Sequence, residues 1–246
     1  TVYGQAECAM LVDSTLAKAM ASAIAEQAQL PVFDRELDLP QAYRLQHEVS
    51  RFRANAEIGG IKAGVTNRKS QEYFQIDHAL IGSLYADAKL PNNCKLPYAE
   101  GRLIECEAAL LVNEEGAPVS IAPAIEFVLP KFARQSEMTA SGLIACNLCA
   151  ESYIVGAWQP WSASFNTAWV TLVCNGARAN HAALEEALNG PEEAARWMWQ
   201  EAGMRGFPLG DQTLFLTGAC GRAVPAEIGE YTADYGALGS LSFVVV

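Results

Sequence analysis

Residues 102–112 read RLIECEAALLV, a stretch typical of a buried strand except for two carboxylates placed two residues apart. Side chains at i and i+2 of a strand point to the same face, so Glu105 and Glu107 are expected to share one. Two like charges on a mostly apolar face repel each other and are costly to desolvate. A divalent cation relieves this cost, because hard cations prefer carboxylate oxygens. The alternative is an exposed edge strand with both acids in water.

Strand-like segments dominate the chain from this run onward, whereas helical patterns precede it. We predict strands at 103–112, 152–155, 168–174, 213–216 and 240–246, with helices near 122–128, 141–149 and 191–202. Asp13 is expected to cap a helix over 14–29, and Asp38 with Pro40 to open a second helix. A third helix is predicted over 67–74 and a loop over 86–96. The organisation is an N-terminal helical segment, 1–57, joined to a β-rich core, 58–246, in one structural unit.

The composition limits the classes of partner. The 246 residues are 51% hydrophobic and 18% charged, enough apolar material for a sizeable core. A net charge of −11 argues against nucleic acid or an anionic membrane surface as partner. No apolar run approaches the roughly 20 residues that a membrane-spanning helix needs, and no signal-peptide pattern opens the sequence.

The seven cysteines are scattered through apolar segments, which suits reduced, buried thiols in a cytoplasmic protein better than a disulfide framework. Cys146 and Cys149 form a lone CxxC pair. A zinc site usually needs a second ligand pair, and the chain holds only three histidines. We therefore interpret the pair as core packing, with zinc binding or redox chemistry as the alternatives.

Lys62 stands alone among Gly59, Gly60 and Gly64, in a segment with little side-chain bulk. Such a lysine is either a plain solvated charge or a cation held where the backbone lets a ligand approach closely. No glycine-rich dinucleotide or phosphate loop and no GxSxG elbow is present in the sequence.

Several segments, in a shared order, resemble motifs of the fumarylacetoacetate hydrolase superfamily, nearest to its 2-keto-4-pentenoate hydratase and 4-oxalocrotonate decarboxylase branch. The resemblance covers roughly residues 16–246. Its motifs are GIKAGVT at 60–66 against G-x-K-x-G-L-T, ID and IGSL at 76–84 against V-D-x-x-x-x-G-x-L, IECEAA at 104–109 against I-E-x-E-I-A, AIEFVLP at 124–130 against A-I-E-x-V-x-P, and 210–219 against G-D-x-x-L-T-G-A.

The resemblance implies an α+β, β-rich fumarylacetoacetase-like fold, with a rolled mixed sheet and flanking helices, that assembles into homo-oligomers. It also implies a Mg²⁺ or Mn²⁺ site that chelates the carboxylate and 2-oxo group of a small 2-keto acid. Glu105 and Glu107 would hold the metal. Lys62 would pair with the substrate carboxylate or steady the developing enolate. Asp77 and Thr217, in matched motifs, would bind substrate.

The third metal carboxylate of the family follows the pattern V-x-P-A-L-E, and here the sequence departs. Aligned on Val128 and Pro130, the pattern places Ala133 where the glutamate belongs. Glu126 is matched with a helix glutamate of the family, and Glu137 is the candidate replacement ligand. The family segment D-N-A-S has become Cys146-Asn147-Leu148-Cys149. The expected metal site is therefore weak or absent.

Three reactions are ranked on this basis. Hydration of a 2-hydroxypenta-2,4-dienoate-type compound comes first, decarboxylation of an oxalocrotonate-like diacid second and hydrolysis of an acylpyruvate third. The rival from another class is a repurposed, non-catalytic member that supports a paralogous or pathway enzyme.

Overall fold

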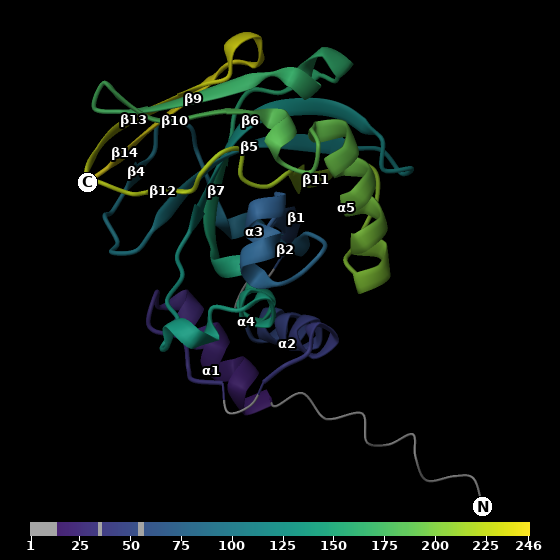
Figure 1. Cartoon of the computed structure of the whole chain (residues 1–246), viewed down its shortest axis with the longest axis vertical. Coiled ribbons are helices and arrows are strands. Elements are labelled where there is room, and N and C mark those ends of the chain that lie inside the picture. Colours follow the sequence, from purple (N-terminus) through teal and green to yellow (C-terminus); the bar gives the residue numbers. More distant parts are fainter. Residues whose placement is uncertain (1–13, 34–35, 54–56) are drawn as a thin grey trace, which may run out of the picture.

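Two β-sheets packed together, with helices gathered at one end, make up the computed structural model, which describes residues 14–33, 36–53 and 57–246 (Figure 1). The larger sheet has the order β2-β1-β11-β5-β6-β7-β3, with β12 added beside β5 and β8 beside β6. Because β1 and β11 are parallel while β11, β5, β6 and β7 alternate in direction, this sheet is mixed. Its strands are β1 Ile58–Gly64, β2 Leu80–Tyr85, β3 Lys89–Leu90, β5 Leu103–Val112, β6 Pro118–Val128, β7 Ala150–Val155, β8 Gln159–Pro160, β11 Thr213–Leu216 and β12 Val224–Pro225.

The second sheet has the order β10-β9-β13-β14-β4 and packs on one face of the first. Phe127 of β6 meets Phe243 of β14 edge to face, with ring centroids 5.1 Å apart. Such buried aromatic pairs carry much of the apolar burial between the layers. The strands are β4 Lys95–Leu96, β9 Trp169–Cys174, β10 Ala177–Ala183, β13 Gly229–Asp234 and β14 Ser240–Val245.

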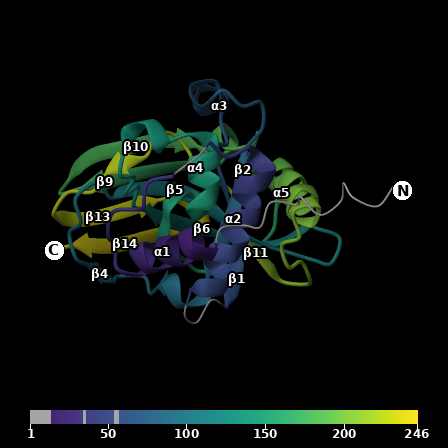
Figure 2. The same cartoon turned by 90° about the horizontal axis from the view of Figure 1, so that it is seen from below.

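The helices α1 (Ser14–Ala25), α2 (Leu39–Phe52) and α4 (Ala140–Ala145) lie together at one end of the molecule (Figures 1 and 2). Asp38 begins α2 as predicted: its carboxylate accepts from the Gln41 amide at 2.7 Å, and the Gln41 side chain accepts from the Asp38 amide. The buried side chains of α1 share an apolar cluster with Leu45 and Val49 of α2 and with Val128 of β6. Asp13, the expected cap of the first helix, lies outside the described residues.

Two further helices complete the fold: α3 (Arg68–Phe74) lies in the connection between β1 and β2, and α5 (Pro191–Arg205) packs beside the large sheet (Figure 1). Asn67 caps α3 through the Ser70 amide at 2.9 Å. Within the described residues, no helix is both long and apolar enough to cross a membrane. The predicted α+β class with a mixed sheet and flanking helices is confirmed.

The helix predicted near 122–128 is wrong, because these residues form the second half of β6. Ile121, Ile125 and Phe127 alternate toward the core, and the segment pairs with β5 over its whole length. Residues 121–128 are buried on both faces of the strand, so sheet pairing outweighs the helix propensity of the alanines. Two more differences from the predicted elements arise from strand pairing. The short strands β3 and β4 lie within the predicted loop 86–96, and no strand was predicted where β10 and β13 occur.

Candidate metal and substrate site

Glu105 and Glu107 share one face of β5, as the spacing predicts, because the alternate residues Ile104, Cys106 and Ala108 enter the main core. The Glu107 side chain is fully buried and Glu105 is half-buried. The alternative of an exposed edge strand is wrong, because β5 is covered on both sides by β11 and β6.

A third carboxylate comes from the neighbouring strand. Glu126 of β6 is the direct register partner of Glu105 and is 1% exposed. The oxygens of Glu105, Glu107 and Glu126 lie within 4.8 Å of one another, close enough for one ion to contact all three. Among the described residues this is the one group of three or more potential ligands that meets this criterion.

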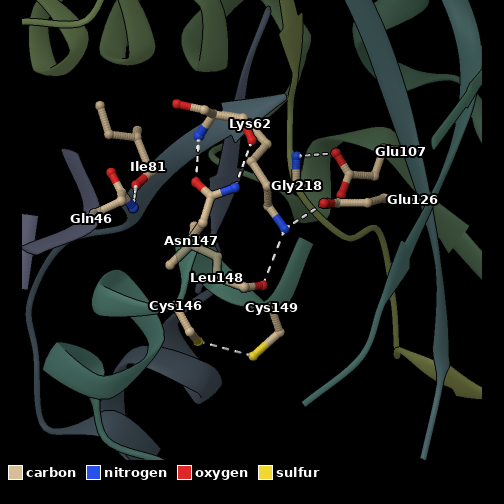
Figure 3. A network of polar contacts seen from close by, with 11 residues as sticks. Gln46, Lys62, Ile81, Glu107, Glu126, Cys146, Asn147, Leu148, Cys149 and Gly218 are labelled. Carbon is tan, nitrogen blue, oxygen red and sulfur yellow. Dashed lines mark hydrogen bonds and ion pairs between the residues drawn. The ribbon is translucent and has the colours of Figure 1, made fainter. Parts of the chain in front are cut away.

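Lys62 of β1 supplies the buried cation that faces this cluster (Figure 3). Its Nζ lies 2.6 Å from Glu126 Oε1, and it donates a long hydrogen bond of 3.5 Å to the Leu148 carbonyl. The side chain is 2% exposed, so the charge is not solvated. The glycines around Lys62 therefore surround a buried cation, which excludes the solvated alternative.

Gly218, after β11, completes the setting of Glu107. Its amide donates to Glu107 Oε2 at 2.7 Å, and its φ is +93°. A side chain at this position would collide with that of Thr66 and would strain the backbone. A glycine is therefore required for the amide to reach the carboxylate.

Burial dominates the electrostatics of the cluster. It raises the pKa of Glu105 to about 7, against the attraction of Lys62. Burial and the neighbouring charges of Glu126 and Glu105 raise the pKa of Glu107 well above its usual value, and burial raises that of Glu126. Desolvation lowers the pKa of Lys62 more than any other single cause, but the three carboxylates together outweigh it and leave that pKa raised. One ammonium thus faces three acids that hold protons unusually well.

A tight turn holds the Leu148 carbonyl toward Lys62. Asn147, Leu148 and Cys149 have φ of 57°, 54° and 58°, and the Cys149 amide donates to the Cys146 carbonyl at 3.2 Å. Leucine rarely adopts a positive φ. The Asn147 side chain secures the turn: its Oδ1 accepts from the Ser83 amide at 2.7 Å and its Nδ2 donates to the Ser83 carbonyl at 2.8 Å.

A cavity of about 850 Å³ opens in front of the cluster, with Lys62 and Glu105 in its wall. Glu107 and Glu126 lie directly behind them and do not line it. The volume falls in the range of small-molecule sites, roughly 300–1,000 Å³. The cluster is thus accessible from one side, through Glu105 and Lys62.

The structure does not bring three of the predicted site residues to this cavity. Asp77 is exposed on the turn before β2. Thr217 is buried, and its hydroxyl accepts from the Ala108 amide at 3.3 Å. Glu137 is held apart by the Phe33 amide at 2.8 Å and the Arg134 amide at 3.2 Å. Ala133, like these three, does not line the cavity.

The sequence does carry a signal for Glu126. Residues 121–126 read IAPAIE, which matches V-x-P-A-L-E without a gap. Aligning the pattern on Pro130 shifted the expected ligand to Ala133 and assigned Glu126 to a helix. The strand register corrects both: Glu126, and not Glu137, completes the cluster.

The buried carboxylates fit a divalent cation. Within the described structure, Glu107 Oε1 and Glu126 Oε2 have no hydrogen-bond partner, and Glu126 Oε1 meets the Lys62 ammonium only as an ion pair. Buried acceptors without partners are costly. Three ionised carboxylates against one ammonium leave two negative charges, which a divalent ion would balance.

No protein-family model matches the sequence. The fold, however, is similar to that of 4-oxalocrotonate decarboxylase from Pseudomonas putida G7, complexed with magnesium and adipate: TM-score 0.85, 21% identity, over 95% of this chain and 97% of that one. It is also similar to fumarylpyruvate hydrolase from Pseudomonas aeruginosa, in complex with Mn²⁺ and pyruvate: TM-score 0.58, 16% identity, over 76% and 88%. A third likeness is to 5-carboxymethyl-2-hydroxymuconate delta-isomerase from Mycobacterium smegmatis: TM-score 0.57, 15% identity, over 77% and 80%.

Proposed function

We propose that this chain, which has the fumarylacetoacetase-like fold, is a lyase that uses a divalent metal to act on a small 2-keto acid. The observation that carries the proposal is the cluster of Glu105, Glu107 and Glu126 around Lys62 at the wall of a cavity. The solved structures with this fold include proteins that hold Mg²⁺ or Mn²⁺ together with a carboxylate ligand.

Glu105, Glu107 and Glu126 would hold the ion, with Glu105 nearest the cavity. Bound Mg²⁺ or Mn²⁺ supplies a Lewis acid that polarises the oxygens of the 2-keto acid. Gly218 fixes the orientation of Glu107 through its amide. The presence of Glu126 restores the carboxylate that appeared to be lost, which weakens the alternative of a repurposed, non-catalytic protein.

Lys62 would serve the substrate directly. Its ammonium lies in the cavity wall and keeps one further donor position besides the contacts with Glu126 and the Leu148 carbonyl. It is placed to receive the substrate carboxylate and to stabilise negative charge that develops on the adjacent enolate oxygen. Burial strengthens this interaction, because water screens it little.

Hydration of a 2-hydroxy-2,4-dienoate is our first candidate reaction. Decarboxylation is the second candidate, favoured by the TM-score of 0.85 to a decarboxylase over nearly the whole of both chains. Both reactions use the same head group and the same electron withdrawal, so the cluster does not distinguish them.

The first experiment titrates the purified protein with Mn²⁺ by calorimetry, with and without oxalate, a non-reactive mimic of the head group. We expect Mn²⁺ binding that oxalate tightens, because a chelating head group adds ligands to the ion. Turnover of 2-hydroxypenta-2,4-dienoate and of a 4-oxalocrotonate-type diacid is then compared by absorbance. The proposal would be rejected if the protein bound no Mn²⁺ and turned over neither compound.

A further inference from the structure

The sheet face that carries the acids becomes apolar immediately beside them. On β5 and β6, Glu105 pairs with Glu126, and the next pair on the same face is Leu103 with Val128. Both Leu103 and Val128 line the same cavity as Glu105. A substrate whose head lies at Glu105 and Lys62 therefore meets hydrocarbon two residues further along each strand.

Segments beyond the sheet continue this apolar wall. Pro130 follows β6, Leu143 comes from α4 and Leu148 from the left-handed turn, and all three line the cavity. Leu148 is also the residue whose carbonyl contacts Lys62, so the wall begins next to the head-group cation. Head site and apolar wall are thus continuous parts of one cavity.

The cations of the cavity are poorly placed for a second carboxylate at the far end of a substrate. Lys62 is already paired with Glu126 at the head. Lys69 and Arg222 are exposed, and the Arg222 guanidinium donates twice to the Ala179 carbonyl, at 3.1 and 2.8 Å. Among the described residues lining the cavity, these three are the cations. A carboxylate placed against the apolar wall would be desolvated without a charged or hydrogen-bonding partner.

We infer that the substrate carries an apolar alkyl or aryl tail on its 2-keto-acid head, and no second carboxylate at the end of that tail. This inference rests on the proposed function, because it takes the head group to lie at Lys62 and Glu105. It separates the protein from enzymes of linear dicarboxylates, and Leu143 and Val128 become the residues that determine specificity.

The test compares three ligands on the Mn²⁺-loaded protein by calorimetry: pyruvate, 2-oxohexanoate and 2-oxoadipate. The last two have chains of equal length and differ in the terminal carboxylate. Each buried methylene is worth roughly a fourfold gain in affinity, so 2-oxohexanoate is expected to bind at least about tenfold more tightly than pyruvate. We expect 2-oxoadipate to bind no more tightly than pyruvate.

Variants locate the effect. Leu143→Ala should weaken 2-oxohexanoate binding severalfold and leave pyruvate unchanged, and thermal denaturation verifies that the variant is folded. Val119→Ala, on a partly exposed residue of β6 that does not line the cavity, is the matched control. Leu143→Arg should raise the affinity for 2-oxoadipate relative to 2-oxohexanoate.

Two results would overturn the inference while sparing the proposed function: 2-oxoadipate binding more tightly than 2-oxohexanoate, or 2-oxohexanoate binding no better than pyruvate. Either result counts against the inference only if oxalate binds the Mn²⁺-loaded protein. Failure of oxalate and pyruvate alike would instead reject the proposed function, and this inference with it.

Discussion

Glu105 and Glu126 face each other as register partners across the antiparallel strands β5 and β6. Pairing of the strands, and not proximity along the chain, places the third carboxylate beside the first two. Any change that shifts this register by one residue would turn Glu126 to the opposite face. The cluster is therefore a property of the sheet and is as rigid as the central strands that carry it.

The first prediction concerns Glu126 as a ligand. Glu126→Gln should weaken Mn²⁺ binding by at least tenfold in calorimetry, because a neutral amide replaces a carboxylate that the ion needs. Glu137→Gln is the matched control and should bind Mn²⁺ like the wild type, since Glu137 is held by the Phe33 and Arg134 amides. Ala133→Glu should likewise gain nothing. Loss of binding in Glu137→Gln, with Glu126→Gln unaffected, would reverse the assignment.

The second prediction is an inverted pH dependence of stability in the metal-free protein. The pKa of Glu105 is raised by burial from its usual 4.5 to about 7. Between these values the folded protein keeps a proton that the unfolded chain has released, so its stability falls as pH rises through this window. Glu105→Gln should flatten that fall in urea titrations at a series of pH values.

The affinity for Mn²⁺ should rise with pH over the same range in which the stability of the metal-free protein falls. Mn²⁺ must displace protons from the cluster, so its affinity should rise with pH up to about 7. Saturating Mn²⁺ should also remove the loss of stability at neutral pH. An affinity for Mn²⁺ that is the same at both ends of the window would show that the cluster does not bind the ion.

The third prediction concerns Lys62. Because Lys62 forms a buried ion pair with Glu126, Lys62→Met should lower stability as well as ligand affinity. Removing one partner of a buried ion pair costs about 3 kcal/mol of unfolding free energy, and less at low pH where the acids are protonated. Oxalate affinity should fall by about 2 kcal/mol, the scale of a charge-assisted contact.

Lys69→Met is the control for Lys62. Lys69 lines the same cavity but is exposed, so its loss should change neither stability nor oxalate affinity appreciably. A Lys62→Met variant with unaltered urea midpoint and oxalate affinity would place Lys62 outside the functional site.

The contrast between Glu107 and Glu126 shows what the sequence could predict. Glu105 and Glu107 follow from the local alternation of a strand, and Lys62 from its setting among glycines. Strand segments with a clear apolar period, such as β5 and β11, were likewise predicted at their observed bounds. Glu126 was missed because the pattern V-x-P-A-L-E was aligned on Pro130 and not on Pro123, and the local sequence does not show that Glu126 pairs with Glu105 of β5. Asp77 and Thr217 were assigned by motif position alone, and neither side chain lines the cavity.

The fourth prediction concerns the turn below Lys62. Asn147→Ala should cost about 3 kcal/mol of stability, since it leaves the buried amide and carbonyl of Ser83 without partners and removes a residue tolerant of positive φ. Asn189→Ala is the matched control, because Asn189 is exposed at φ 62°. Its cost should stay near 1 kcal/mol, the backbone contribution alone. Equal costs in urea denaturation would show that the Ser83 contacts add nothing.

The last prediction concerns the thiols of Cys146 and Cys149, whose sulfur atoms lie 3.4 Å apart (Figure 3). The turn between them is closed by the bond from the Cys149 amide to the Cys146 carbonyl, which keeps the α-carbons within the span of a disulfide. Contact with Cys146, together with burial, raises the pKa of the Cys149 thiol, so little reactive thiolate exists at neutral pH.

A thiol oxidant such as diamide should therefore close this pair slowly near pH 7 and faster near pH 9. The measurement is intact mass, which falls by two hydrogen atoms, with peptide mapping to locate the bond. Cys146→Ser should abolish the change, whereas Cys106→Ser should not, because the described structure gives Cys106 no thiol contact of this kind. A disulfide joining any other pair, or none at the higher pH, would contradict the geometry of the turn.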